Sequence, residues 1–451
     1  MAKIDTRFLM RCAFALLMLS LHPMVQAGIP IQQWTQASGV KVYLVESHVI
    51  PMVDVQLDFD AGSRRDPPDK AGLASVTAGM ASRGIAAAGA AGALDENALS
   101  EAWADLGASF GSSATGDRMA FSLRSLTYPD LLSKAVQLAA RQLAHPEFAS
   151  DIWRRQRDQI GAALKESRTR PASVAARAFN AAVFASHPYG YEMTETTLAG
   201  IEVADMKALY ARLIAPCRAK VSIVGAVTRA QADALVTELF SRLDKGAPCA
   251  ALPVVAEVAT LARAEELQIA FDSAQAHVMI GQPGFKRDDP DFFPLTVGNY
   301  ILGGGGFVSR LYEEVRQKRG LSYSVYSYFS PALHAGAFAI GLQTRPDQAA
   351  QAVAVSREVL AQFVRDGPTE VELDAAKANL IGGFALRIDS NRKLLDNLSS
   401  IAWNNLALDY LDTWTQQVQR MTAADIQQAF ARKLQPQRMV TVVVGARQGG
   451  G

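Results

Sequence analysis

The order of apolar and polar residues predicts strands and helices in both halves of this chain. KVYLVES (41–47) and MVDVQLDFDAG (52–62) alternate apolar and polar residues, as strands with one buried face do. HVMIGQPGF (277–285) has the same pattern in the second half, whereas LLSKAVQLAARQLA (131–144) and QAAQAVAVSREVLAQFV (348–364) place apolar residues at helical spacing. Each half is therefore predicted to fold as an α+β domain, with an antiparallel-leaning mixed sheet and helices packed on one face.

An internal repeat indicates that the two halves are homologous. ADMKALYARLIAPCRAKVSIVGA (204–226) matches ADIQQAFARKLQPQRMVTVVVGA (424–446), 220 positions later. Near the start of each half, GSRRDPPDKAGL (62–73) matches GFKRDDPDFFPL (284–295) at an offset of 222. Two matches in the same order and at nearly the same offset are typical of a tandem duplication.

The repeat and the composition together predict the domain boundaries. We expect an N-terminal domain at 28–247 and a C-terminal domain at 263–447. Residues 248–262 between them are rich in Ala and Pro and lack clear periodicity, so they are predicted to be a linker. The last four residues, 448–451, are predicted to be a disordered tail.

The first 27 residues have the pattern of a secretory signal peptide. Lys3, Arg7 and Arg11 precede the apolar run CAFALLMLSL, and VQA (25–27) satisfies the small-x-small rule for cleavage. The apolar run is short for a membrane span, although an uncleaved anchor remains an alternative. We therefore expect an exported, soluble protein, with a signal of the kind that directs proteins to a bacterial periplasm.

Composition and cysteine content restrict the partners and the redox state. With 49% hydrophobic residues, 20% charged residues and a formal net charge of +1, the chain is globular in type. Nothing in this balance suggests nucleic acid or an acidic membrane as a partner. Beyond the signal, the cysteines are Cys217 and Cys249. They could form a disulfide in an oxidising compartment or remain two inert thiols.

The sequence offers no metal-binding or nucleophilic motif. The six histidines (His22, His48, His145, His187, His277 and His334) are all more than ten residues apart. This spacing excludes H-E-x-x-H and H-x-x-E-H, which bind zinc because both imidazoles share one helix face. There is no G-x-S-x-G motif. The run Gly303, Gly304, Gly305 and Gly306 fits neither a P-loop nor a dinucleotide-binding motif, so we expect a flexible or closely approached backbone there.

One segment of the second half is richer in chemistry. In SRLYEEVRQKRGLSYSVYSYFSP (309–331), a charged helix is predicted to stop at Gly320 before a strand with alternating Tyr and Ser. A tight turn could bring Arg316 and Tyr323 together, so that both donate hydrogen bonds into one cleft. The alternative is a solvated helix end followed by an ordinary aromatic strand.

These features together resemble the pitrilysin/insulinase family of inverted-motif zinc peptidases. The resemblance rests on the repeat, on G-S-x-x-D-P-x-x-x-G-L-A (62–74), on HPYG (187–190) and on LGGGGFVSRLYEEVRQKRGLSYSV (302–325), and it spans about 36–446. It is closest to the short bacterial and mitochondrial-processing-peptidase branch. In that branch two short subunits associate, so that the second domain of one faces the first domain of the other.

The resemblance places the family's zinc site on residues that cannot bind zinc. Where the family has H-x-x-E-H, this chain has Ser75, Val76, Thr77, Ala78 and Gly79. The third ligand of the family, a glutamate, corresponds to Gln156, which lies between two arginines. Zn²⁺ would meet uncompensated positive charge there, so we expect no zinc in this chain.

The resemblance also implies a role for the arginine and tyrosine of the second half. The family holds its substrate with an arginine–tyrosine pair seven residues apart, which Arg316 and Tyr323 match. The resulting hypothesis is a non-catalytic, periplasmic subunit that supplies this pair and half of a peptide chamber to a homologous partner carrying H-x-x-E-H and the zinc. A scaffold or peptide-binding protein of the same fold, with no part in proteolysis, is the alternative.

Overall fold

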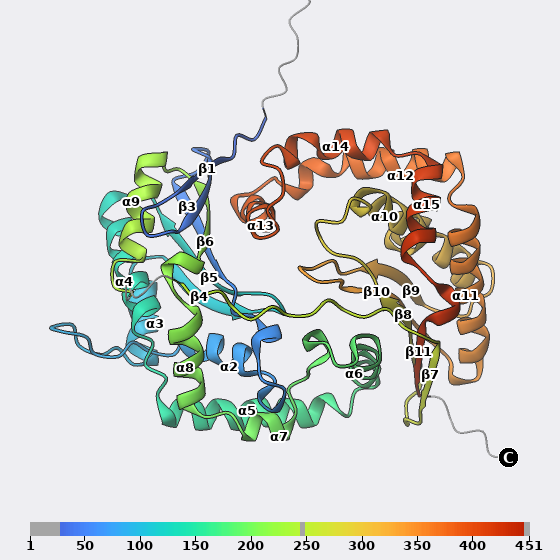
Figure 1. The fold of residues 1–451 in the computed structure, drawn as a ribbon, viewed down its shortest axis with the longest axis horizontal. Coiled ribbons are helices and arrows are strands. Elements are labelled where there is room, and N and C mark those ends of the chain that lie inside the picture. The colour runs from blue at the N-terminus through green and yellow to red at the C-terminus, as the bar shows by residue number, and fades with distance from the viewer. Residues whose placement is uncertain (1–27, 244–248, 446–451) are drawn as a thin grey trace, which may run out of the picture.

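The computed structural model describes residues 28–243 and 249–445 (Figure 1). The predicted signal peptide, the 247/248 boundary and the predicted tail lie outside these residues. Residues 249–262 contain neither helix nor strand and run from the first domain to the second (Figure 1). No helix in the described ranges has the length and apolar character needed to cross a membrane.

A six-stranded sheet in the order β1-β2-β6-β3-β5-β4 forms the centre of the first domain. Its strands are β1 (Gln32–Thr35), β2 (Lys41–Glu46), β3 (Met52–Phe59), β4 (Ser109–Ala114), β5 (Met119–Leu126) and β6 (Lys220–Gly225). The helices of this domain are α2 (Leu73–Ala81), α3 (Glu96–Asp105), α4 (Pro129–Ala144), α5 (Ser150–Ser167), α6 (Pro171–Phe184), α7 (Glu195–Ala199), α8 (Val203–Leu213) and α9 (Arg229–Leu239).

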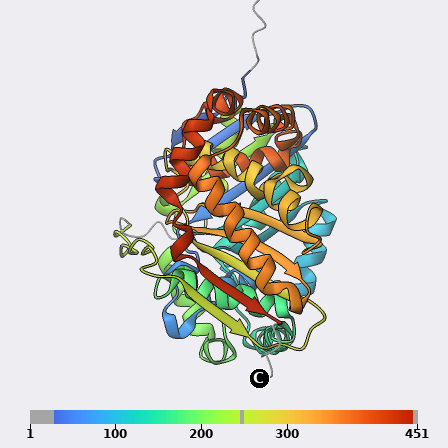
Figure 2. The ribbon, with the colours of Figure 1, turned by 90° about the vertical axis from the view of Figure 1, so that its right-hand side faces the viewer.

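The second domain repeats this plan with a five-stranded sheet in the order β7-β11-β8-β10-β9. Its strands are β7 (Glu265–Ile269), β8 (Ala276–Pro283), β9 (Ser324–Phe329), β10 (Ala337–Thr344) and β11 (Val440–Val444). Its helices are α10 (Phe292–Asn299), α11 (Ala349–Asp366), α12 (Glu370–Gly382), α13 (Asn391–Trp403), α14 (Tyr410–Arg420) and α15 (Ala423–Lys433). Figure 2 shows α11 and α15 on the outer side of this sheet.

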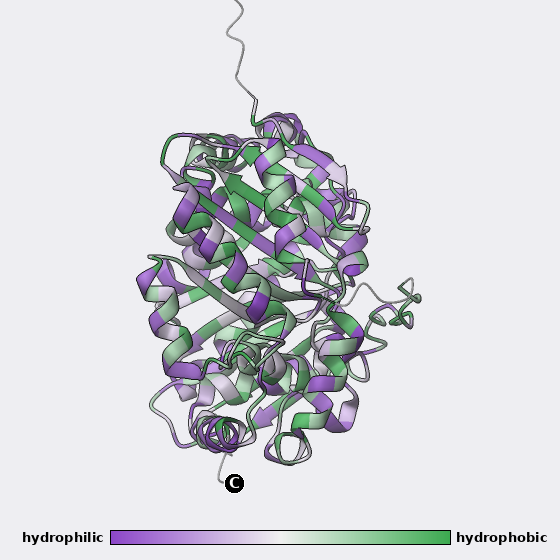
Figure 3. Ribbon diagram, turned by 90° about the vertical axis from the view of Figure 1, so that its left-hand side faces the viewer, coloured by the Kyte–Doolittle hydropathy of each residue, from purple (hydrophilic) through white to green (hydrophobic). Residues whose placement is uncertain are grey.

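Both sheets are mixed and mainly antiparallel, which confirms the predicted fold class. In each sheet one pair of strands is parallel, β2 with β6 and β7 with β11, and the other pairings are antiparallel. Without β1, the first sheet has the strand order of the second, as a duplicated unit should. Each domain's own helices pack on one face of its sheet and form a separate apolar core. Polar and apolar residues alternate along the outer helices of the first domain (Figure 3).

The other face of each sheet is covered by a helix from the opposite domain. Helix α6 packs on β8, β10 and β11 of the second sheet, where Phe179 is buried. Helix α13 packs on β3 and β6 of the first sheet, where Leu398 is buried. The two helices lie 220 positions apart in sequence, which is the offset of the repeat. The domains therefore exchange equivalent helices.

This exchange corrects one expectation about the strands. The alternating pattern of 41–47 predicted one exposed face, but Val42, Tyr43, Leu44 and Val45 are all buried. Tyr43 and Val45 contact α13, whereas Val42 and Leu44 face the first domain's own helices. Tyr43, on the face that the alternation predicted to be exposed, makes an apolar contact to the other domain.

Candidate functional site

Helix α2 carries Ser75, Ala78 and Gly79, the positions where the sequence resemblance predicts the family's zinc motif. It begins after Gly72, whose φ of +102° is a left-handed conformation that favours glycine. The Asp66 carboxylate accepts hydrogen bonds from the backbone N–H groups of Gly72 (3.0 Å) and Ala74 (2.9 Å). Burial raises the pKa of Asp66 to about 7, against these N–H donors, which lower it. The Asp of the GSRRDP motif thus positions the helix start.

The three degenerate zinc-motif positions on α2, two at histidine ligands and one at the motif's glutamate, differ in their surroundings. Ser75 and Gly79, one helical turn apart, are exposed, whereas Ala78 is buried and its carbonyl accepts a hydrogen bond from Ser112 Oγ at 2.6 Å. A Cβ atom added at Gly79 would meet no atom within 4 Å. Two of the three positions therefore face outward, without imidazoles, and the third is part of the packed interior.

The fourth position, Gln156, lies on α5 and donates a hydrogen bond to Gln159 at 3.1 Å. Its neighbour Arg155 forms an ion pair with Glu96 at the start of α3, and Arg83 just after α2 binds the same carboxylate. The two arginines lower the pKa of Glu96. Within the described residues, no group of three or more His, Cys, Asp or Glu side chains is placed to hold a metal ion.

The structure places Arg316 against Tyr323 in the second domain. The Arg316 guanidinium carbon lies 4.6 Å from the ring centre of Tyr323 and 4.8 Å from that of Tyr312, so it stands between two aromatic rings. Tyr323 is 77% exposed. The helix stop at Gly320 has a φ of +62°. Neither the Arg316 guanidinium nor the Tyr323 hydroxyl makes a hydrogen bond or ion pair within the described part of the chain.

The sequence analysis missed Tyr312 as the second ring beside Arg316. The two residues are four positions apart, a spacing that places side chains on one face of a helix. The segment Tyr312–Gln317 is a π-helical turn, a form that often marks functional sites. The i,i+4 pattern of tyrosine and arginine was the signal that could have indicated this contact.

The glycine run is closely approached by neighbouring backbone, as expected. A Cβ at Gly303 would lie 2.5 Å from the backbone nitrogen of Ser327 on β9, and one at Gly305 would lie 2.7 Å from the Tyr300 carbonyl oxygen. Gly306 has a φ of +62°. The glycines therefore allow this segment to pack directly on the edge strand that follows Tyr323.

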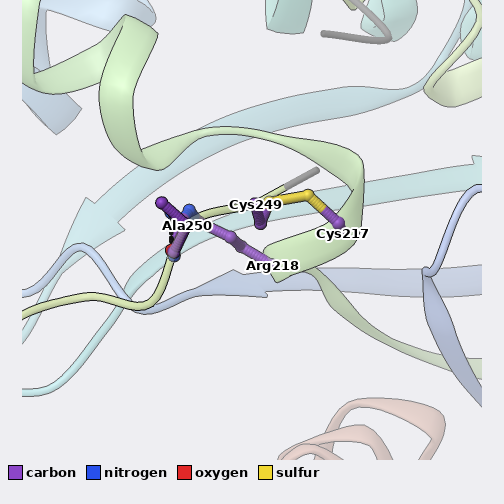
Figure 4. The surroundings of a disulfide bond; sticks show 4 residues. All are labelled: Cys217, Arg218, Cys249 and Ala250. Carbon is purple, nitrogen blue, oxygen red and sulfur yellow. Dashed lines mark hydrogen bonds between the residues drawn. A yellow bond between two sulfur atoms is a disulfide. The ribbon is translucent and has the colours of Figure 1, made fainter. Parts of the chain in front are cut away.

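Cys217 and Cys249 form a disulfide with a Cα–Cα distance of 6.2 Å (Figure 4). Arg218, beside Cys217, donates a hydrogen bond to the carbonyl of Ala250 at 2.7 Å. The disulfide and this hydrogen bond attach the start of the interdomain segment to the turn before β6.

The HPYG segment takes part in a contact between the domains. Three consecutive backbone N–H groups in the loop between β9 and β10 donate to side chains from outside the second domain. Leu333 donates to Asp117 (3.0 Å), His334 to the Tyr189 hydroxyl (3.2 Å) and Ala335 to Glu257 (2.9 Å). Asp117 also accepts from the Tyr189 hydroxyl at 2.5 Å. We name these three acceptor side chains the interdomain latch.

His187 of the same segment packs beside the latch. Its ring centre lies 5.2 Å from that of His334, and its Nε2 lies 3.1 Å from the Ala256 carbonyl oxygen. Burial, reinforced by the neighbouring His334, lowers the pKa of His187. The HPYG residues therefore hold the two domains together and do not belong to the zinc position.

Comparison with known proteins identifies the family. Residues 41–197 match the family model described as insulinase (peptidase family M16), and residues 200–380 match one described as peptidase M16 inactive domain. An uncharacterised zinc protease of Mycobacterium bovis is 30% identical over 70% of this chain and 72% of its own. A protein of Helicobacter pylori named non-peptidase homolog YmxG is 27% identical over 91% of this chain and 93% of its own.

Solved structures agree with this family. The crystal structure described as peptidase M16 inactive domain from Pseudomonas fluorescens has a TM-score of 0.86 and 33% identity, covering 93% of this chain and 99% of that one. The periplasmic protease PqqL of Escherichia coli has a TM-score of 0.78 and 19% identity, covering 94% of this chain and 46% of that one, and supports the fold alone. The chain belongs to the insulinase (M16) peptidase family, and it is a member without the family's zinc-binding residues.

Proposed function

We propose that this chain is the non-catalytic subunit of a heterodimeric periplasmic zinc peptidase. It supplies Arg316 and Tyr323, and half of a peptide chamber, to a homologous subunit that carries H-x-x-E-H. The observation that carries this proposal is the pair itself: Arg316 is held between two rings, and Tyr323 is exposed beside it.

The pair is suited to hold a peptide at the bond to be cleaved. Arginine and tyrosine donors aimed at a carbonyl oxygen stabilise the negative charge that develops on it during hydrolysis. Stacking between Tyr312 and Tyr323 orders the Arg316 guanidinium in advance, so that less side-chain entropy is lost on binding.

The first domain lacks zinc-binding side chains at the motif positions, whereas the second domain has an ordered Arg316–Tyr323 pair. These two features are consistent with a division of labour between two subunits. Ser75, Ala78, Gly79 and Gln156 supply neither imidazole nor carboxylate. The partner would therefore contribute the zinc and its activated water, and this chain would contribute substrate-binding donors. Relatives named zinc proteases and one named a non-peptidase homologue support a family in which both kinds of member exist.

Reconstitution with a partner tests the proposal. The purified chain should bind no stoichiometric zinc and should cleave no peptide. Mixing it with an H-x-x-E-H homologue from the same source should restore cleavage of an unfolded peptide. Arg316→Ala or Tyr323→Phe should lower kcat/KM of the mixed complex by about 100-fold or more, because a lost oxyanion donor costs on the order of 2.7–4 kcal/mol in enzymes that depend on it.

Arg319→Ala is the matched control. Arg319 lies on the same segment and pairs with Glu314 at 2.5 Å, so its loss should leave the activity unchanged. If Arg316→Ala and Tyr323→Phe both leave the mixed complex fully active, the chain is a scaffold. One tightly bound zinc per isolated chain would also contradict the proposal. Fractionation of cells that express the full chain tests the proposed periplasmic location.

A further inference from the structure

A cavity of about 480 Å³ lies between the two domains. The first domain contributes the turn between β4 and β5, including Asp117 and Arg118. The second contributes the end of α13 and residues around α10, including Arg287. Neither the zinc position nor the Arg316–Tyr323 pair lines this cavity.

Two arginines give the cavity a positive charge. Arg287 forms no ion pair with a carboxylate within the described residues. Its guanidinium carbon lies 3.7 Å from the ring centre of Phe292, and one N–H group donates to the Tyr410 hydroxyl at 2.7 Å. These two contacts order the group, and its remaining N–H groups make no hydrogen bond in the described structure.

The other charges at the cavity do not cancel that of Arg287. Arg118 forms an ion pair with Asp58 at 3.1 Å. Asp117 is the one carboxylate among the described lining residues, and its oxygens already accept from Arg64, Tyr189 and the Leu333 amide. A carboxylate ligand would therefore be attracted to Arg287, and a cationic one would be repelled.

Aromatic side chains form much of the remaining wall: Phe285, Phe292, Phe329 and Trp403. A ligand that fits must combine an anionic group with an apolar one. The C-terminal residue of a peptide with an apolar side chain has this combination.

The position of the cavity relates it to the Arg316–Tyr323 pair. Phe329, in the cavity wall, is the last residue of the edge strand β9, and Tyr323 immediately precedes its first residue. Tyr323 and Phe329 are six positions apart, which is about 20 Å at roughly 3.3 Å per residue. The cavity and the pair therefore lie at opposite ends of one strand.

We propose that the cavity binds the C-terminal carboxylate of a peptide together with the apolar side chain of its last residue. Arg287 is the carboxylate-binding residue, and the aromatic wall holds the last side chain. This inference rests on the proposed function, because it assigns a second anchoring point to the same peptide. The chain would then hold peptides by their C-terminal end.

Peptide binding to the isolated chain tests this assignment. The probe is an N-terminally fluorescein-labelled peptide of about ten residues that ends in Phe, made as the free acid and as the C-terminal amide. We expect the amide to bind about tenfold more weakly, as loss of a charge-assisted hydrogen bond implies. In Arg287→Gln the acid should bind as weakly as the amide, while affinity for the amide stays within about twofold.

Two controls separate the carboxylate site from other effects. Arg345→Gln removes an exposed arginine that pairs with Asp347, and it should preserve the difference between acid and amide. An amidated peptide with Glu as its penultimate residue should bind like the plain amide. If it binds like the free acid, the site recognises acidic side chains, and the assignment to a C terminus is wrong.

The outcomes distinguish this inference from the proposed function. Equal binding of acid and amide, or a difference that persists in Arg287→Gln, overturns the carboxylate site while leaving the role of Arg316 and Tyr323 to the reconstitution assay. If neither peptide binds the isolated chain, the cavity is not a peptide anchor. If Arg316→Ala also leaves the reconstituted complex fully active, the proposed function fails as well.

Discussion

At the scale of single residues, α2 has no side chain that can bind zinc at the three positions where the family resemblance places H-x-x-E-H. Ser75 and Gly79 are exposed on one helix face, and the space around the Gly79 Cβ direction is open. Ala78 differs, because it is buried and its carbonyl is bound by Ser112. Histidines at Ser75 and Gly79 would extend from exposed positions, whereas a glutamate at Ala78 would have to be accommodated at a buried one.

This difference leads to a zinc-binding prediction. The variant Ser75→His, Ala78→Glu, Gly79→His and Gln156→Glu should bind about one zinc per chain, measured by elemental analysis after dialysis, whereas the wild-type chain should bind none. Two imidazoles at i and i+4 with a carboxylate from α5 provide the three protein ligands of a catalytic zinc site. The same variant with Gln156 retained is the control, and it should bind at least about tenfold more weakly. Equal zinc binding by both would show that α5 does not complete the site.

The sequence could predict the arginine–tyrosine contact but not its full form. The seven-residue spacing and the predicted helix end at Gly320 indicated that Arg316 could meet Tyr323. The structure places the two side chains together. The sequence could not predict that Arg287 and Arg118 line the same cavity. These residues are far apart in the chain and meet only because the two domains pack together. A local sequence pattern can indicate a contact within one segment, such as Arg316 with Tyr323, but not a contact between residues of different domains.

At the scale of elements, the exchange of α6 and α13 makes each sheet depend on the other domain. The fit of α6 is close: a Cβ at Gly281 on β8 would lie 2.8 Å from the Phe179 ring, so glycine is needed beneath the helix. On α13, Leu398 is fully buried against the first sheet. The contacts are side-chain packing, which implies that neither sheet keeps its native environment without the other domain.

Shortening the side chains that make these two helix contacts should therefore destabilise the whole molecule. Leu398→Ala should lower the free energy of unfolding by about 2–5 kcal/mol, and Phe179→Ala by about 3–5 kcal/mol, as measured for large-to-small changes in cores. Chemical denaturation followed by circular dichroism measures both. Leu386→Ala, at a position that is 66% exposed, is the control and should change stability by less than about 0.5 kcal/mol. Small effects from all three would show that the domains are stable independently.

The repeat made the two sheets predictable, whereas the exchange was not. Strand alternation and helical periodicity predicted the fold class of each domain, and the offset of 220 also relates α6 to α13. Periodicity shows that a helix has an apolar face but not which sheet will cover it. The packing partner depends on how the domains are joined, which is tertiary information.

At the scale of the whole molecule, the disulfide ties the interdomain segment to the first domain. It closes a loop of 32 residues in sequence separation. A crosslink of that length is expected to stabilise a protein by about 2–4 kcal/mol, by restricting the unfolded chain. Cys249→Ser should therefore lower the melting temperature under oxidising conditions, and it should equal the wild type once dithiothreitol is added. A variant that melts like the oxidised wild type would show that the crosslink contributes nothing.

The interdomain latch gives the molecule an expected response to acid. Burial raises the pKa of Glu257, but Lys286 and the backbone N–H of Ala335 outweigh it and hold this pKa at about 2. The carboxyl has a pKa near 4.5 when unperturbed. Since the folded state lowers the pKa, the unfolded state binds the proton more tightly, and the contribution of Glu257 to stability is present above about pH 4.5 and lost as the pH falls towards 2.

Glu257→Gln should reveal this contribution as a difference that depends on pH. Above about pH 5 the variant should melt at a lower temperature than the wild type, because it loses the ion pair with Lys286 at 2.7 Å. The expected loss is under about 1 kcal/mol, since the side chain is 42% exposed and solvent screens the pair. The difference should shrink as the pH falls towards 2, where Glu257 is also neutral. Glu358→Gln, an exposed carboxylate on α11 outside the latch, should show no such trend. A gap in melting temperature that stays constant from pH 7 to about 2.5 would mean that the charge of Glu257 does not hold the domains together.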